Sequence, residues 1–344
     1  MVDDNRRKFI KSAGVAGTVG LGGLSGCIGG GIGGGGTPTI NFNYVVPIEN
    51  AASLLDVPEV REELENVGSA YELNVTRNAS TPDSLNQMAA GEADVAMTTT
   101  VSFASAVNQD AVPNGISVVG VDFWDADPDY FSVTVFSGPD SEITEPADME
   151  GKTLGVNALG TGVHSIYVKA LQQAGLTQDD VEFVETPFPT MTSAIKDGKI
   201  DVGIYTALFS VGARSDGFTK VFESADLWDR AFPFAYATAS KSSLDNKTEA
   251  MSAWVDDYAG LFEYVRNNRD SVVSAAATHF ELPEALVDAF YFTQENGYRR
   301  DVRIDIDALQ YIADDLVELG FLDQSVDVQQ HATNEYLPGS GGDS

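Results

Sequence analysis

"KTLGVNALGTGVHSIYVKALQQAG", from Lys152 to Gly175, contains a complete strand–loop–helix unit. The run Lys152–Val156 predicts a strand, and "GVHSIYVKALQQAG" predicts an amphipathic helix that ends at Gly175. The loop between them is small and polar, and it leads into free backbone N–H groups at the start of the helix. Such a unit is the building block of a parallel α/β sheet.

The same unit recurs on both sides of this stretch. The first half predicts strands at 39–47, "YELNVTR" and "ISVVGVDFW", with helices in "DVPEVREELENVG" (capped by Asp56, with Pro58 in its first turn) and "STPDSLNQMAAG". The second half predicts strands at 131–138, "VEFVET" and "IDVGIYT", with a helix in "TMTSAIKDG". "AGEADVAMTTT" and "DGKIDVGIYTA" are counterparts: an acidic Gly turn, a strand, then small polar residues. We therefore expect two successive α/β units with mostly parallel sheets flanked by helices.

From Met251 the pattern changes to amphipathic helices, and the C-terminal part of the fold is predicted to be helical. Trp254, Tyr258, Leu261 and Val265 share one face of the first of these helices. The tail 339–344, "GSGGDS", is predicted to be disordered.

The net charge of the chain excludes nucleic-acid binding and indicates a high-salt environment. The chain of 344 residues carries 52 acidic and 20 basic residues, a net charge of −32, which excludes a nucleic-acid-binding surface. The acids are scattered among 18 Phe and 12 Tyr, so the chain is expected to fold. A dispersed acidic surface is typical of halophile proteins, where salt screens the repulsion; an ordinary acidic surface protein is the alternative. The three histidines and one cysteine lie far apart, so no metal site or cofactor is expected.

The N-terminal 38 residues look like an export signal followed by a tether. "NRRKFIK" contains the pair Arg6 and Arg7, and a weakly apolar stretch of small residues leads to "LSGC", which ends at Cys27. This order resembles a twin-arginine signal followed by the lipobox of lipoproteins. The resemblance implies that 1–26 are a signal peptide, that Cys27 carries lipid, and that the Gly-rich stretch 27–38 is a flexible tether.

Small polar residues follow several predicted strands, at the edge where open α/β sheets bind ligands. Helix capping alone would also explain each of these loops. Because several of them occur on two successive units, we expect them to share one ligand-binding cleft. The candidate ligand-binding residues are Ser80, Thr81, Thr98, Thr99, Thr100, Gly160, Thr161, Gly162, His164, Tyr205 and Thr206.

The sequence does not support any of the catalytic motifs that it superficially resembles. "GKT" at Gly151–Thr153 is not a phosphate loop, because Pro146 stands where that loop needs a glycine. The chain contains no G-x-S-x-G nucleophile motif, and Cys27 is assigned to the lipid anchor. No catalytic residue is therefore predicted, and the protein is not expected to be an enzyme.

Four motifs carry a family resemblance over 39–337. "ADMEGKTLGVNALGTGVHSIYVKALQQAGL" (Ala147–Leu176) resembles the second lobe of ABC-transporter substrate-binding proteins of the nitrate/sulfonate/taurine type, with matches at Asp148, Gly151, Lys152 and Gly155. "MAAGEADVAMTTT" and "IKDGKIDVGIYTALFS" resemble the family's element whose following residues line the site. "DALQYIADDLVELGFLDQSVDV" resembles its C-terminal helix.

The resemblance implies a two-lobed, periplasmic-binding-protein-like class II fold. Lobe 1 would comprise 39–134 and 238–338, lobe 2 would comprise 135–237, and the chain would cross between them near 131–138 and 233–240. It also implies a monomer, lipid-anchored at Cys27 on the extracellular face of the cytoplasmic membrane, that delivers a small solute to an ABC permease and its ATPase subunit. Closure of the lobes on the solute would be the mechanism.

The nature of the solute stays open. Helix N-termini and hydroxyls favour a small anion of the nitrate, sulfonate or taurine kind, with Arg77 and Arg214 as the nearest cations. A pyrimidine of the thiamine-precursor branch is the alternative ligand, and an enzyme or a surface sensor on the same fold are the alternative functions. Aromatic stacking or contact with a cationic group would instead use Phe123, Trp124 and Tyr205, or Glu49 and Asp122.

Overall fold

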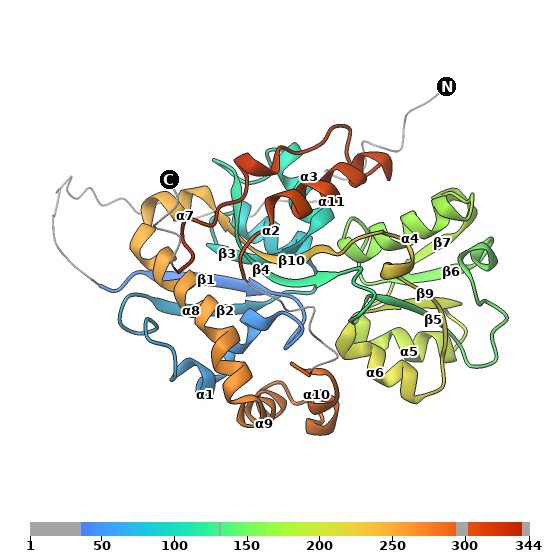
Figure 1. Cartoon of the computed structure of the whole chain (residues 1–344), viewed down its shortest axis with the longest axis horizontal. Helices are drawn as coiled ribbons and strands as arrows, with labels where there is room; N and C mark the ends of the chain where they lie inside the picture. The colour runs from blue at the N-terminus through green and yellow to red at the C-terminus, as the bar shows by residue number, and fades with distance from the viewer. Residues whose placement is uncertain (1–35, 131, 294–301, 339–344) are drawn as a thin grey trace, which may run out of the picture. The chain divides into compact units, whose positions relative to one another are not determined.

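The computed structural model describes residues 36–130, 132–293 and 302–338 (Figure 1). The signal pair Arg6 and Arg7, the anchor Cys27, most of the tether and the tail 339–344 lie outside these ranges. Within them, no helix is both long and apolar enough to cross a bilayer.

Two five-stranded sheets form the framework. The first has the order β2-β1-β3-β10-β4, and its strands are β1 (Thr39–Tyr44), β2 (Glu72–Arg77), β3 (Val95–Thr99), β4 (Ile116–Asp125) and β10 (Phe232–Ser240). The second has the order β7-β6-β8-β5-β9, and its strands are β5 (Thr134–Ser137), β6 (Thr153–Val156), β7 (Glu182–Glu185), β8 (Val202–Tyr205) and β9 (Thr219–Glu223). The predicted fold class, mixed α/β with two mostly parallel sheets, is confirmed.

Each sheet is parallel except for one inserted strand. β1 pairs in parallel with β2 and β3, and β6 does so with β7 and β8. β10 runs antiparallel between β3 and β4, and β5 runs antiparallel between β8 and β9. Both inserted strands come directly after the chain has passed from one sheet to the other.

Helices follow the strands, as the βα pattern predicts. The helices of the first half are α1 (Pro58–Arg61), α2 (Thr81–Ala89) and α3 (Thr100–Asn108); those of the second half are α4 (Gly162–Gln173), α5 (Phe188–Lys196) and α6 (Ala207–Ser215). The C-terminal part is helical as predicted, with α7 (Lys241–Asn246), α8 (Thr248–Asn267), α9 (Arg269–His279), α10 (Glu284–Phe290) and α11 (Ile306–Glu318). Short 3₁₀ helices lie at η1 (Ala51–Asp56), η2 (Pro146–Met149), η3 (Gln178–Asp180), η4 (Ser224–Asp226) and η6 (Val328–Gln330).

The C-terminal helices cover the first sheet. α8 packs on β1 and β4, and α11 packs on β10 and α3. Trp254, Tyr258, Leu261 and Val265 of α8 are all fully buried, which confirms the predicted apolar face. This face removes apolar area from water along most of α8.

Two local predictions were wrong: the extent of the helix around Pro58 and the place of the second crossing. The helix expected over 56–68 is reduced to α1, whose cap is Val57 and not Asp56. Val57 is extended because it precedes Pro58, so no helix can pass through it. Beyond α1, Asn66 donates its backbone N–H and its amide to Asp257 of α8, and this contact holds the chain in a turn.

The second crossing lies earlier than expected. Phe232–Ser240 is paired within the first sheet as β10, so the chain crosses between Glu223 and Phe232 and not within 233–240. Its nearly continuous run of apolar residues suits a strand buried on both faces. The lobe limits themselves stay a prediction.

Asp125, the last residue of β4, ties the two crossings together. Its Oδ1 accepts the N–H of Val133 on the first crossing at 2.9 Å and the hydroxyl of Ser224 on the second at 2.7 Å. Burial raises the pKa of the Asp125 carboxyl to about 6, although both hydrogen bonds oppose that rise. The crossings are thus held side by side by one buried side chain.

The repeated sequence element has a repeated structural role. Asp94, before β3, accepts the backbone N–H of Asn41 in β1 at 2.8 Å, and Asp201, before β8, accepts that of Thr153 in β6 at 2.8 Å. In each sheet an aspartate therefore caps the start of the neighbouring parallel strand.

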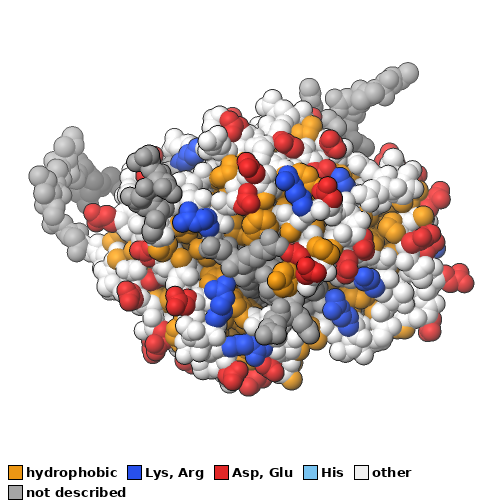
Figure 2. Space-filling model, viewed as in Figure 1, with side chains coloured by type: hydrophobic (Ala, Val, Ile, Leu, Met, Phe, Trp, Pro, Cys, Tyr) orange, Lys and Arg blue, Asp and Glu red, His pale blue; other side chains and the backbone are white. Residues whose placement is uncertain are grey.

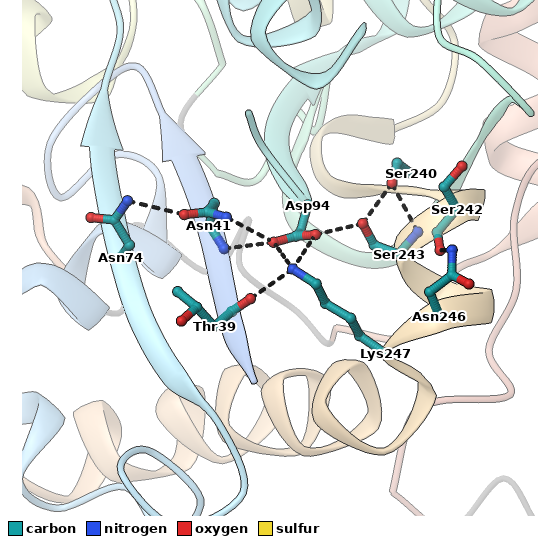
Figure 3. A network of polar contacts seen from close by, with 9 residues as sticks. All are labelled: Thr39, Asn41, Asn74, Asp94, Ser240, Ser242, Ser243, Asn246 and Lys247. Atoms are coloured by element: carbon teal, nitrogen blue, oxygen red, sulfur yellow. Dashed lines mark hydrogen bonds and ion pairs between the residues drawn. The ribbon is translucent and has the colours of Figure 1, made fainter. Parts of the chain in front are cut away.

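Asp94 carries a second set of contacts that Asp201 lacks (Figure 3). Its carboxylate accepts from Ser243 Oγ at 2.6 Å and from Lys247 Nζ at 2.8 Å, and Lys247 also donates to the carbonyl of Thr39. This network joins β1 and β3 to α7 and α8. It is buried at Asp94, where removal of one partner leaves the others without theirs.

We predict that Asp94→Ala lowers the free energy of unfolding by about 3 kcal/mol, because it strands a partly buried ammonium and three further donors. Asp201→Ala is the matched control: it removes the same backbone contact at an exposed position and should cost at most about 1 kcal/mol. Equilibrium urea unfolding at fixed salt measures both. Equal losses in the two variants would show that the Lys247 network contributes nothing.

Candidate functional site

Helices of both sheets begin with threonine at the carboxyl ends of strands. Thr99, Thr161 and Thr206 are the residues immediately before α3, α4 and α6, and all three have extended backbone. Thr81 is the first residue of α2, after the cap Ser80. Since a helix start exposes N–H groups and the positive end of the dipole, these four positions define a polar rim.

A cavity of about 50 Å³ lies among these helix starts. Threonines from both sheets line it, together with an apolar remainder that includes Phe123 and Phe234, whose rings stack with centroids 5.5 Å apart. The full lining is Val45, Val46, Glu49, Asn50, Thr81, Met97, Thr98, Thr99, Phe123, Asn157, Thr161, Gly162, Val163, Phe188, Thr206, Phe234 and Ala235.

Two helix starts of the second sheet are capped by side chains from the first. Glu49 accepts the N–H groups of Ala207 at 3.3 Å and Leu208 at 2.9 Å, so its carboxylate occupies the N-terminus of α6. Thr99 Oγ1 accepts the N–H of Gly162, the first residue of α4, at 3.1 Å. These contacts hold the two sheets together around the cavity.

The loop that presents Glu49 is strained and strongly held. Ile48 has φ +66°, a conformation that β-branched residues rarely adopt, and its N–H donates to Ser53 Oγ at 2.7 Å. Asn50 accepts the N–H of Val46 at 3.0 Å and donates to Asp122, which also accepts the N–H of Ala51 at 2.9 Å. The buried Asp122 therefore positions the loop and does not line the cavity.

Two hydroxyls at the cavity have no hydrogen-bond partner. Thr81 Oγ1 and Thr206 Oγ1 are buried and unpartnered among the described residues, and both residues line the cavity. A buried hydroxyl without a partner costs about 1–3 kcal/mol, so these two hydroxyls are unsatisfied polar groups in residues of the cavity wall.

The structure brings together six of the predicted site residues. Thr98 also lines the cavity, but its hydroxyl is engaged with Thr238 at 2.6 Å. Ser80 lines the neighbouring hollow and caps α2 through the N–H of Asp83. The six predicted residues that line the cavity are Thr81, Thr98, Thr99, Thr161, Gly162 and Thr206.

Besides Ser80, four predicted site residues do not line the cavity. Gly160 lies in the preceding turn with φ +70°, and Thr100 is buried in the first turn of α3. Tyr205 is buried with its hydroxyl 3.2 Å from Thr192 Oγ1. His164 packs edge-on against Phe183 and Phe321, with ring centroids 4.8 and 5.1 Å away. The His164 ring is therefore part of the packing beneath α4.

Of the alternative candidates, Glu49 and Phe123 line the cavity. Trp124, which follows Phe123 on β4, does not. Arg214 lies over the ring of Phe136 and lines a separate hollow. The residues that sequence reasoning missed are Val45, Val46, Asn50, Met97, Asn157, Val163, Phe188, Phe234 and Ala235; Phe234 stood in the segment assigned to the crossing.

A larger hollow of about 630 Å³ adjoins the cavity and shares Val45, Val46, Asn157 and Phe188 with it. Arg77, Asp83 and Glu185 all line this outer hollow. The inner cavity differs from the outer hollow in charge, because Glu49 is the one ionisable side chain in its described lining. Within the described ranges, no group of His, Cys, Asp and Glu could hold a metal ion.

Two sheets of matching order, joined by two crossings and enclosing a cavity at their helix starts, define a periplasmic-binding-protein fold. The chain belongs to the NMT1/THI5 like family, whose model matches residues 71–268. No curated protein matches the chain.

Solved structures share the fold at low sequence identity. The periplasmic aliphatic sulphonate binding protein SsuA from Escherichia coli is 16% identical with a TM-score of 0.66, covering 85% of this chain and 91% of that one. The alkanesulfonate-binding protein SsuA from Xanthomonas axonopodis pv. citri, bound to MOPS, is 16% identical with a TM-score of 0.68 and coverage of 86% and 98%. The desulfurization enzyme DSZB is 16% identical with a TM-score of 0.61 and coverage of 87% and 97%.

Gly162 lies where the start of α4 contacts the first sheet. A Cβ there would lie 2.9 Å from Phe234 and 3.0 Å from Thr99. We predict that Gly162→Ala loosens the contact at a cost of about 1–3 kcal/mol. Amide exchange at 207–208 of the ligand-free protein should then speed up by about tenfold or more.

Gly260→Ala within α8 is the control, since nothing lies within 4 Å of its added Cβ. It should leave exchange at 207–208 unchanged and strengthen the helix by about 0.5–1 kcal/mol. Unchanged exchange in both variants would show that the Gly162 contact does not hold the sheets together.

His164 should make stability pH-dependent. Burial lowers its pKa to about 4 in the folded protein, from the ordinary 6.5 of the unfolded chain. Between these values the unfolded state binds the proton and the folded state does not. The contribution of His164 is therefore fully present above pH 6.5 and decreases as the pH falls to about 4.

The difference in unfolding free energy between the wild type and His164→Gln, which cancels the other titrations, should shrink by about 2–3 kcal/mol over that range. Urea unfolding at a series of pH values measures it. A difference independent of pH would mean that the His164 ring is protonated in the fold or titrates as in the unfolded chain.

Proposed function

We propose that this protein is the extracytoplasmic solute-binding component of an ABC importer. The observation that carries the proposal is the cavity enclosed by helix starts of both sheets, with two unpartnered threonine hydroxyls in its wall. A molecule held there would contact both sheets at once, so its binding would favour the state in which the sheets are closed around it. The fold of the SsuA proteins, whose names describe sulfonate binding, supports the same role.

The residues that line the cavity are suited to solute binding without a chemical step. Within the described residues the cavity has no Cys, His or Lys, and its threonine hydroxyls lack a neighbouring imidazole or amine that would activate them. DSZB shows that the fold also supports an enzyme, so the absence of turnover is part of the proposal.

Export and anchoring complete the proposal. A twin-arginine signal with Arg6 and Arg7, and lipid on Cys27, would place the folded body on the extracellular face of the cytoplasmic membrane. A tether of 27–38 would let a monomer reach the permease and its ATPase subunit. Acidic side chains are dispersed over the face in Figure 2, which is compatible with a salty exterior.

The test is a ligand screen with the full chain. Nitrate, alkanesulfonates, taurine, bicarbonate and pyrimidines are added at graded concentrations, and the thermal midpoint is recorded. A true solute at 100 times its Kd should stabilise the fold by about 2.7 kcal/mol and remain chemically unchanged. Chromatography of the recovered solute checks the second point. Chemical turnover of a solute would show that the protein is an enzyme. The absence of a shift in the thermal midpoint with every solute class would refute the proposal.

A further inference from the structure

The charged and amide side chains in the wall of the inner cavity are engaged with the protein itself. The Glu49 carboxylate accepts the N–H groups of Ala207 at 3.3 Å and Leu208 at 2.9 Å, so it is matched to the start of α6. Asn50 accepts backbone N–H groups of its own loop and donates to Asp122 at 3.2 Å. Neither side chain needs a bound molecule as its partner.

The threonine hydroxyls of the wall offer little to a ligand either. Thr98 Oγ1 lies 2.6 Å from a hydroxyl of β10, Thr99 Oγ1 accepts the first N–H of α4, and Thr161 Oγ1 donates to a carbonyl of its own loop at 2.8 Å. The hydroxyl oxygens of Thr81 and Thr206 are shielded from solvent, so a molecule in the cavity does not reach them. The polar side chains of the wall are thus satisfied or covered.

The rest of the cavity wall is apolar. Its side chains include Met97, Phe123, Val163, Phe188, Phe234 and Ala235. The volume of about 50 Å³ admits a short alkyl group. Burial of each methylene in such a place strengthens binding by about fourfold, whereas a polar group gives up its hydration there without finding a partner.

The outer hollow of about 630 Å³ is polar by contrast. Arg77 is the one cation in the described lining of either space, and it enters no ion pair among the described residues. The two acids of the hollow are engaged: Asp83 accepts from Ser80 Oγ at 2.7 Å, and Glu185 accepts the N–H of Leu159 at 3.0 Å. A solvated head group with acceptor oxygens therefore suits the hollow, which adjoins the inner cavity at Asn157 and Phe188.

We infer that the site binds its solute end-on, with a short unsubstituted alkyl end in the inner cavity and an oxyanionic head in the outer hollow. This inference rests on the proposed solute-binding function and names the class of solute. It narrows the small anion expected from the sequence to acids that end in an alkyl group. An acid that ends in an ammonium group is rejected, because the ammonium has three donors and the wall has no free side-chain acceptor for them.

The test compares two pairs of acids in which only the far end differs. Propanesulfonate and taurine share a length and a sulfonate head, and butyrate and β-alanine share a length and a carboxylate head; the first of each pair ends in methyl and the second in ammonium. Isothermal titration calorimetry with the full-length protein at pH 7 and constant ionic strength gives each Kd. The methyl-ended acid should bind at least about tenfold more tightly in both pairs.

Chain length gives a second readout on the wild type. From methanesulfonate through ethanesulfonate to propanesulfonate, the affinity should rise by about fourfold for each added carbon. A solute held instead by its head at the helix starts would leave its alkyl end in the hollow, and its affinity would then be independent of chain length. That result would contradict the end-on orientation.

Val163→Thr replaces a methyl by a hydroxyl of similar size in the cavity wall. It should weaken propanesulfonate by about threefold or more and narrow the preference over taurine. Val168→Thr is the matched control, because Val168 is a buried valine of the same helix that does not line the cavity. It should keep the wild-type Kd values, and equal losses in both variants would contradict the place given to Val163.

Equal or tighter binding of taurine or β-alanine by the wild type would overturn the inference and leave solute binding intact. Failure of all four acids to bind would also overturn it, and the wider ligand screen then decides solute binding by itself. Because the wild-type pairs already test the preference for the alkyl end, the result does not depend on whether either variant folds.

Discussion

The backbone N–H groups at the starts of helices constrain the whole site. A parallel βα unit puts every helix start at the same edge of its sheet, so several unsatisfied donors gather there and must find acceptors. Here two of those acceptors, Glu49 and Thr99, belong to the first sheet and the donors to α6 and α4. One requirement therefore joins the sheets and shapes the cavity.

Support for these contacts comes from buried carboxylates behind the cavity. Asp122 fixes the loop that carries Glu49, and Asp125 holds the two crossings side by side. A buried carboxylate needs hydrogen-bond donors, and Asp122 and the Oδ1 atom of Asp125 accept from groups in the surrounding chain, which fixes those segments. The loop that carries Glu49 is consequently held in place at the cavity wall.

The repeated sequence elements correctly predicted the framework of strands and helices. "AGEADVAMTTT" and "DGKIDVGIYTA" do occupy equivalent places, and Asp94 and Asp201 make the same bond to the neighbouring parallel strand. Strand and helix periodicity is a local property, so the βα units and the apolar face of α8 could be read directly. The segment 233–240 could not, because a strand inserted antiparallel between β3 and β4 is defined by its neighbours.

By itself, the sequence determined the fold class, the helical C-terminal part and the threonine positions at the helix starts, because these depend on local patterns of apolar and capping residues. Tertiary structure alone decided which of those positions meet. It turned His164 and Tyr205 into packing, since their helix and strand direct them away from the cavity. It also placed the Glu49 carboxylate on α6, a pairing 158 residues apart in the chain that no local pattern encodes.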